Sequence, residues 1–105
     1  SYISGGWGVV SYNLGTGSGT VTPSPFNGNY QYITNNGAFT LAAPSYDCAI
    51  DILVTNGASA GSISLTGFIA PSVSGDPYAT TNTYKFLLMI RRIGGTSTYA
   101  WKALQ

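Results

Sequence analysis

The chain has 105 residues and a mass of 10.9 kDa, which is enough for one domain with a single hydrophobic core. Only 7% of the residues are charged, the net charge is +1, and histidine is absent. Globular domains usually carry about 25% charged residues. Because basic residues adjoin only at Arg91-Arg92, we expect no nucleic acid as a partner. A surface so poor in charge favours a subunit of a permanent assembly over a dispersed monomer.

The sequence lacks most of the side chains that catalytic sites and metal sites commonly use. Without histidine there is no imidazole base, and the single cysteine, Cys48, cannot build a Cys/His zinc site. The three carboxylates are Asp47, Asp51 and Asp76, and the first two would lie about 13 Å apart on a strand, too far for glycoside hydrolysis. Calcium at a loop aspartate stays an open alternative. We expect no enzyme, no catalytic residue, no metal site and no cofactor.

Short bursts of β-branched and aromatic residues between Gly, Asn, Ser and Pro clusters indicate an all-β fold. We expect an antiparallel β-sandwich, jelly-roll-like, with about seven or eight strands. The glycine-rich run from Gly15 to Gly19 suggests a boundary, with residues 1–19 as an N-terminal arm or edge strand and 20–105 as the sandwich domain. We expect no signal peptide, and the longest apolar run, Phe86 to Ile90, is too short to span a membrane.

Two glycine-containing pairs predict hairpins. Residues 29–34 and 38–41 flank Asn35-Asn36-Gly37, and an Asn-Gly pair favours the positive φ angles of a tight hairpin turn. Gly94-Gly95 is expected to turn the strand 84–93 back on the last residues of the chain. Asn-Gly turns and Thr-Asn pairs recur in the sequence, but no repeat with a period of 20–50 residues is evident, which argues against a solenoid.

Alternation along the strands predicts which side chains enter the core. The strand 48–55 places Cys48 and every second residue after it on one face, so Asp51 and Thr55 face outward. Residues 86–90 are apolar at every position, and a strand of that kind needs cover on both sides. We therefore expect Leu87 and Met89 to lie against another subunit or beneath the N-terminal arm. The predicted core consists of Ile50, Ile52, Val54, Ile63, Leu65, Phe86, Leu88 and Ile90.

Two sets of side chains are candidates for contacts with other molecules. Basic residues before the Gly-Gly turn are either a solvated strand end or hydrogen-bond donors at an interface. Aromatic side chains could stack on sugar rings, although cross-strand aromatic contacts explain the same pattern. The loop 70–82 is long enough to bind a ligand or to pack on a neighbour. The candidate interface residues are Trp7, Leu87, Met89, Arg91 and Arg92, and the candidate ligand-facing residues are Tyr30, Tyr32, Tyr78, Tyr99 and Trp101.

Three segments carry a resemblance to known proteins: Asn29 to Leu41, Asp47 to Gly57, and Ile90 to Gly95 with Thr98-Tyr99. They resemble the C-terminal β-domains of virion structural proteins of tailed bacteriophages and prophages, especially those of alphaproteobacteria. The resemblance implies a virion location and a role in capsid decoration, a head fibre or a tail fibre. It also implies other virion proteins as partners and a homo-oligomer, with a trimer expected. The alternative is a receptor- or glycan-binding module that contacts a host surface glycan through exposed aromatics and the 70–82 loop.

Overall fold

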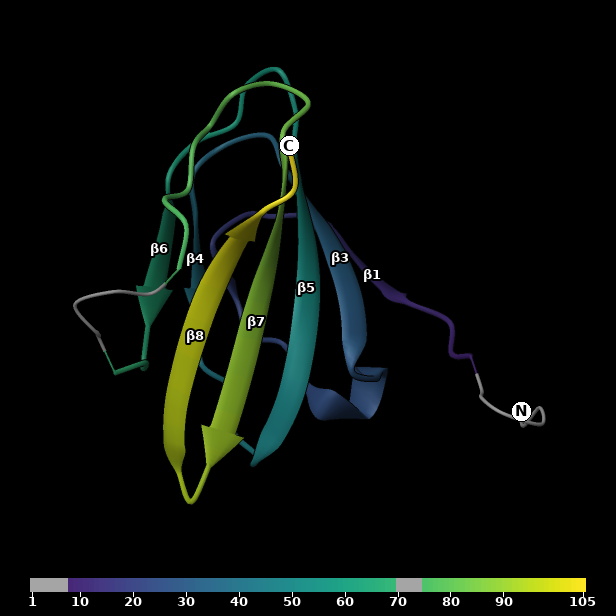
Figure 1. The fold of residues 1–105 in the computed structure, drawn as a ribbon, viewed down its shortest axis with the longest axis vertical. Coiled ribbons are helices and arrows are strands. Elements are labelled where there is room, and N and C mark those ends of the chain that lie inside the picture. The colour runs from purple at the N-terminus through teal and green to yellow at the C-terminus, as the bar shows by residue number, and fades with distance from the viewer. Residues whose placement is uncertain (1–7, 70–74) are drawn as a thin grey trace.

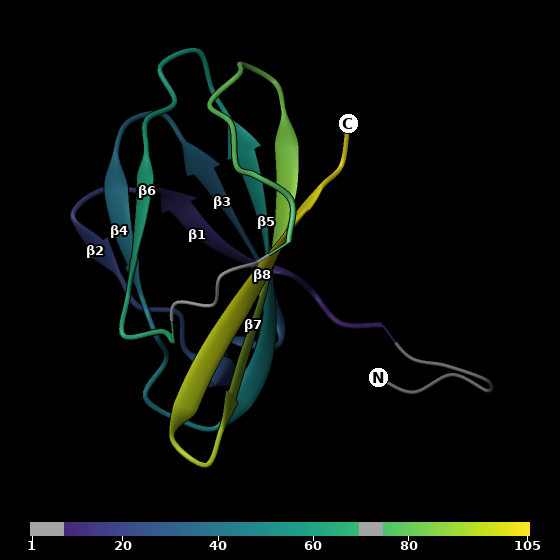
Figure 2. The ribbon, with the colours of Figure 1, turned by 60° about the vertical axis from the view of Figure 1, so that its left-hand side comes forward.

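The computed structural model describes residues 8–69 and 75–105, and in these residues the fold is all-β apart from one 3-10 turn. Eight strands form two sheets that pack face to face (Figures 1 and 2). The predicted all-β class and strand number are confirmed. The elements are β1 (Tyr12–Thr16), β2 (Thr20–Val21), η1 (Pro25–Asn27), β3 (Tyr30–Asn35), β4 (Phe39–Ala42), β5 (Cys48–Asn56), β6 (Ile63–Thr66), β7 (Lys85–Ile93) and β8 (Thr96–Ala103).

The strand order shows a stack of coils in place of the expected antiparallel sandwich. One sheet has the order β1-β3-β5-β7-β8 and the other has the order β2-β4-β6. From β1 to β6 the chain changes sheet at every strand, so β1–β2, β3–β4 and β5–β6 form three coils whose neighbours are parallel in both sheets. Only β7 and β8 add antiparallel pairs. The expectation of an antiparallel, jelly-roll-like sandwich is therefore wrong for four of the six strand pairs.

The coils also give the chain a spatial repeat that we did not expect. In the five-stranded sheet Tyr12 pairs with Gln31 and Gln31 with Ile52, steps of 19 and 21 residues. In the three-stranded sheet the steps are 20 residues from Thr20 to Thr40 and 24 from Thr40 to Ser64. Residues 12–66 thus have the stacked architecture of a short solenoid. Unequal connections between the strands obscure the period in the sequence.

The turn at Asn35-Asn36-Gly37 is a corner between the sheets, which corrects the predicted hairpin. A type I′ hairpin turn needs positive φ at both central residues. Thr83 is the one non-glycine residue with positive φ in the described chain, and Gly37 is not among the glycines that have it. The backbone N–H of Gly37 instead donates to Oδ1 of Asn35 at 3.2 Å, which holds the corner open. The hairpin at Gly94-Gly95 is confirmed, with φ angles of 58° and 80°.

The core lies between the two sheets and agrees with the predicted faces. Six of the eight predicted core residues are fully buried, and Ile63 and Leu65 are half-buried against the others. Sequence alternation did not identify the remaining members, which come from β3, β4 and β8. The buried hydrophobic residues are Ile33, Phe39, Leu41, Ile50, Ile52, Val54, Phe86, Leu88, Ile90 and Trp101.

Two buried asparagines occupy equivalent corners of the second and third coils. Asn35 and Asn56 are paired in register, and a hydrogen bond joins each of them to the hydroxyl of Tyr78. Asn35 also exchanges hydrogen bonds with the backbone N–H and C=O of Gly61, at 3.1 and 2.8 Å. The amide of Asn56 donates to the carbonyls of Ala79 and Thr81 at 2.7 and 3.0 Å. These contacts tie the corners to the chain segment that precedes β7.

Burial of Tyr78 raises the pKa of its hydroxyl above the ordinary value, although the hydrogen bonds with Asn35 and Asn56 lower it. The group is therefore a neutral hydroxyl at physiological pH, able to accept from one amide and donate to the other. Its ring packs between Phe86 and Trp101, with ring centroids 4.7 and 4.8 Å away. One side chain thus joins the polar corner to the apolar core.

We predict that Tyr78→Phe lowers the free energy of unfolding by about 1–3 kcal/mol, because it removes the hydroxyl that donates to Oδ1 of the buried Asn56 and accepts from the amide of Asn35. Tyr84→Phe is the matched control, since Tyr84 is exposed. Chemical denaturation of both variants measures the difference. Equal stability of the two variants would show that the buried hydroxyl contributes nothing.

We predict that Ile52→Ala destabilises the fold by about 2–5 kcal/mol, because the side chain is fully buried in the middle of β5. Ile93→Ala makes the same change at a side chain that is 74% exposed at the end of β7, and it should cost far less. Thermal and urea unfolding of the pair tests the assignment of the inner face. A small loss at Ile52 would contradict it.

Candidate functional site

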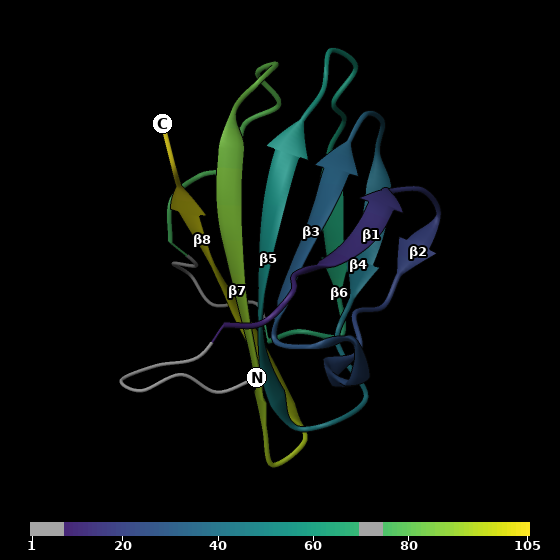
Figure 3. The same cartoon turned by 90° about the vertical axis from the view of Figure 1, so that its right-hand side faces the viewer.

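The second sheet covers one side of the five-stranded sheet, and on the other side the described chain places only the short segment 8–11 before β1 (Figure 3). This other side faces away from β2, β4 and β6, and we call it the outer face. Leu87 and Met89 lie on it, as predicted from the alternation of β7, and both are half-buried. Leu53 of β5 joins them, paired with Leu87. We did not single out Leu53, although alternation from the buried Ile52 places it outward.

The register of the strands arranges the outer face in rows. Paired residues on one face of a sheet have Cβ atoms about 4.5–5.5 Å apart, so each row is a continuous strip of side chains. One row contains Tyr32, Leu53, Leu87 and Lys102, and the next contains Tyr30, Asp51, Met89 and Ala100. Each row begins with a tyrosine on β3 and ends with a short or basic side chain on β8, and Asp51 separates Tyr30 from Met89 in the second row.

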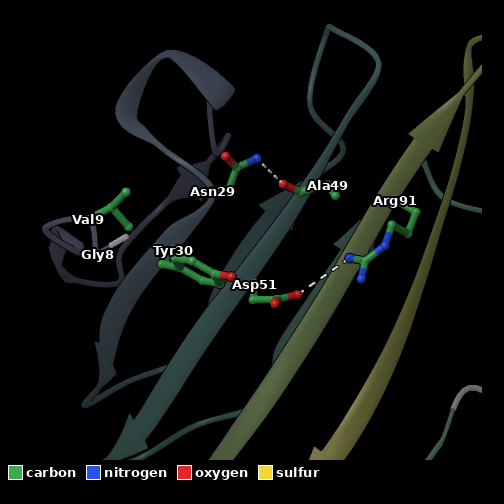
Figure 4. A pocket seen from close by; sticks show the side chains of 7 residues that line it. All are labelled: Gly8, Val9, Asn29, Tyr30, Ala49, Asp51 and Arg91. Carbon is green, nitrogen blue, oxygen red and sulfur yellow. Dashed lines mark hydrogen bonds and ion pairs between the residues drawn. The ribbon is translucent and has the colours of Figure 1, made fainter. Parts of the chain in front are cut away.

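An exposed ion pair joins Asp51, in the second row, to Arg91 on the neighbouring strand β7. Nη1 of Arg91 lies 3.4 Å from Oδ1 of Asp51, and 47% and 29% of the two side chains are exposed (Figure 4). A pair this exposed adds little stability, about 0–1 kcal/mol at most. Its charges therefore remain able to exchange partners with a molecule that docks on the face.

Two shallow hollows open on the outer face and share Tyr30 and Asp51. The larger, of about 550 Å³, also has Arg91 and the backbone before β1 in its lining, as Figure 4 shows. The smaller, of about 350 Å³, extends toward Leu53 and Leu87. The full lining of the larger is Gly8, Val9, Asn29, Tyr30, Ala49, Asp51 and Arg91, and that of the smaller is Ser11, Tyr30, Gln31, Tyr32, Asp51, Leu53 and Leu87.

The five candidate ligand-facing aromatics divide between the two sides of the sheet. Tyr30 and Tyr32 lie on the outer face, 53% and 40% exposed. Tyr99 and Trp101 point inward from β8, where Tyr99 packs edge-on against Phe68. Trp101 is only 7% exposed, and Tyr78 is held beside it in the polar corner. The inward three serve packing, so the sequence-based candidates reduce to the tyrosines of β3.

Arg92 does not share the face of Arg91, because successive residues of a strand point to opposite sides. Nη1 of Arg92 donates to Oδ1 of Asp47 at 3.1 Å. The same carboxylate accepts the N–H groups of Gly94 and Gly95 at 2.8 and 3.1 Å. The hydrogen bonds from Gly95 and Gly94 lower the pKa of Asp47, with a lesser contribution from the charge of Arg92, although desolvation opposes them. Arg92 therefore helps to hold the β7–β8 turn.

Parts of two sequence-based candidates lie outside the described residues. The interface candidate Trp7 lies outside them, and so do residues 70–74 of the candidate loop 70–82. The rest of that loop is tied to the domain: Asp76 donates its backbone N–H to the carbonyl of Trp101 at 2.9 Å, and its carboxylate accepts the N–H of Ala103 at 2.8 Å. β1, inside the proposed arm of residues 1–19, forms the edge of the five-stranded sheet beside β3.

The described residues offer the outer face few groups for chemistry beyond packing and hydrogen bonding. Across residues 8–69 and 75–105, no three His, Cys, Asp or Glu side chains gather as a metal site would require. The same residues contain no helix long and apolar enough to cross a membrane. The face can pack against an apolar surface, stack on a ring through its tyrosines, or form hydrogen bonds through Asp51 and Arg91.

Comparison with protein-family models, curated proteins and solved structures finds no match to this chain.

Proposed function

We propose that the protein is a non-enzymatic structural module that packs its outer face against another subunit of a larger assembly. The observation that carries the proposal is the apolar strip of Leu53, Leu87 and Met89, which lie side by side on β5 and β7 on the side of the sheet that carries no second sheet. Monomeric domains usually place polar side chains on the solvent side of a sheet. Three adjacent large apolar side chains there favour an interface.

The surroundings of the strip fit the anatomy of a protein interface. Interface cores are apolar and depleted in charge, whereas tyrosine and arginine are enriched at interfaces and polar groups form the rim. Tyr30 and Tyr32 flank the strip on one side, and the ion pair of Asp51 with Arg91 lies at its margin. The sparse charge of the whole chain supports the same proposal, because a permanently assembled subunit needs little charge to stay in solution.

The setting we propose is the virion of a tailed bacteriophage, as a capsid-decoration, head-fibre or tail-fibre component. Support for this setting comes from the resemblance of residues 29–41, 47–57 and 90–99 alone. Other virion proteins would be its partners, and the threefold symmetry expected from the resemblance stays a prediction. The stacked coils suit such a role, because a sheet with backbone hydrogen bonds on both sides of each inner strand makes a stiff spacer.

We predict that Leu87→Lys and Met89→Lys each reduce the mass of the assembly that the purified chain forms, because a charge at the centre of an apolar interface loses its hydration. Light scattering coupled to gel filtration measures the mass, and far-ultraviolet circular dichroism should be unchanged. Ser64→Lys, on an exposed position of β6, is the control and should leave the mass unaltered.

Two results would contradict this interface. A variant that keeps the full mass shows that Leu87 and Met89 do not lie at a contact between subunits. A variant that loses its folded circular dichroism signal shows that the two side chains belong to the core of the single chain.

The larger hollow favours a second candidate function, a module that binds a glycan of the host surface. Tyr30 offers an exposed ring for stacking on a sugar, and Asp51 and Arg91 supply an acceptor and a donor beside it (Figure 4). An aromatic face next to a few convergent polar groups is a common composition for small-molecule sites.

If this second function holds, a glycan array probed with the isolated chain gives selective signals that Tyr30→Ala and Tyr32→Ala abolish. Tyr46→Ala is the matched control, because Tyr46 is as exposed as Tyr30 and lines neither hollow. Absence of selective binding by the parent chain, or equal loss with the control variant, removes the glycan function.

A further inference from the structure

The first coil, formed by β1 and β2, leaves one end of the stack open in the described residues. β1 pairs only with β3, and β2 pairs only with β4, so each has one edge without a neighbouring strand in the part of the chain that the structure describes. An unpaired edge presents backbone N–H and C=O groups that another strand can match. Both sheets are open at the same end (Figure 3).

Apolar side chains of the stack are partly exposed at this end. Val21 pairs with Leu41, yet Leu41 is fully buried and Val21 only half-buried. Leu14 packs against the core from β1 and is half-buried as well, and Tyr12 remains 44% exposed. A terminal repeat of a solenoid normally carries a polar outer surface that keeps it soluble. The first coil has apolar side chains in that place.

The end of the stack formed by β1 and β2 carries no charged side chain. The first 46 residues contain no charged side chain, and all seven charges lie between Asp47 and Lys102. Natural proteins commonly use charged side chains, lysine above all, to prevent an edge strand from pairing. That protection is missing from β1 and β2.

The opposite end of the five-stranded sheet is closed. There β7 and β8 cover β5 with an antiparallel hairpin, and the far side of β8 is occupied in turn. Its carbonyls at Ser97 and Trp101 accept N–H groups from Ile69 and Asp76, both at 2.9 Å. Because this end is covered, copies cannot stack head to tail through this sheet.

We infer that the first coil binds a second copy of this chain across a two-fold axis, first coil against first coil. A two-fold axis normal to the sheets places β1 antiparallel to β1 of the partner and β2 antiparallel to β2 of the partner, so both open edges pair at once with strands of equal length. Such a contact is isologous and closes as a dimer. Leu14 and Val21 would meet their counterparts in a shared core.

The contact is short. The register of β1 shifts between Asn13 and Thr16, and β2 has two residues, so the pairing adds few backbone hydrogen bonds. We therefore expect a dimer that dissociates on dilution. It lies on a different surface from the outer face, and either contact can exist without the other.

The test measures the mass of the full chain in a Leu87→Lys background over a range of concentrations, so that the outer face does not contribute. The expected result is a monomer–dimer equilibrium. Adding Thr20→Lys should raise the dissociation constant about tenfold or more, because the axis brings two lysines together at the edge of β2. Thr98→Lys makes the same change on β8 at the closed end and should have no effect.

Disulfide trapping reports the geometry separately. Cysteine replaces Ser11, Asn13 or Thr16 in turn in a Cys48→Ala background, and opposed residues of antiparallel strands lie within disulfide reach. At least one position should give a covalent dimer under mild oxidation, whereas Thr98→Cys should give none. A monomer at every concentration, or no trapped dimer from any of these three positions, overturns the inference. If the Leu87→Lys chain dimerises while the parent has no larger mass, the outer-face proposal fails and this one stands.

Discussion

The paired asparagines Asn35 and Asn56, joined through the hydroxyl of Tyr78, hold the register on which both sheets depend. A slip of β3 by one residue against β5 would move the inward side chains of β3 to the outer face. It would also separate buried amides from their partners, at about 1–3 kcal/mol for each unsatisfied group. Because β4 and β6 follow directly from these corners, the register of one sheet determines that of the other.

Local alternation was sufficient to predict the faces of β5 and β7, including the outward position of Leu87 and Met89. Alternation could not predict which strands are neighbours, because strands joined by a hairpin and strands stacked as coils show the same alternation of apolar and polar residues. The Asn-Gly pair at residues 36–37 was interpreted as a hairpin, but the buried side chain of Asn35 binds the corner and the backbone stays out of the positive-φ region. The recurrence of Thr-Asn at 34–35 and 55–56 was the signal of the repeat, since these residues pair in register.

Alternation also predicted part of the candidate site, namely the side of the sheet on which its residues lie. Residues on a strand reveal their side of the sheet by position, so Arg91 and the two tyrosines of β3 could be placed together once the pairing was known. The positions of Tyr78 and Trp101 could not be predicted, because the segment before β7 folds back onto the core. There Tyr78 packs half-buried against the buried Trp101, a long-range contact without a local sequence pattern. Leu53 could not be identified from the sequence, because a single apolar residue at an outward position indicates no contact surface by itself. Its role follows from the strand pairing, which places it between Leu87 and Tyr32.

The change from parallel coils to an antiparallel hairpin explains why the two ends of the molecule differ. A coil that stacks in parallel always leaves another open edge, so repetition alone cannot end the fold. β7 and β8 end it in the five-stranded sheet by reversing direction, and carboxylates complete the closure: Asp47 binds the N–H groups of the β7–β8 turn, and Asp76 binds the N–H of Ala103. Charge is therefore concentrated where the stack must end and absent where the parallel edges remain unpaired. Assembly at the neutral end is consistent with this arrangement, because there both sheets present an uncharged edge at which the backbone hydrogen-bond pattern of the coils can continue.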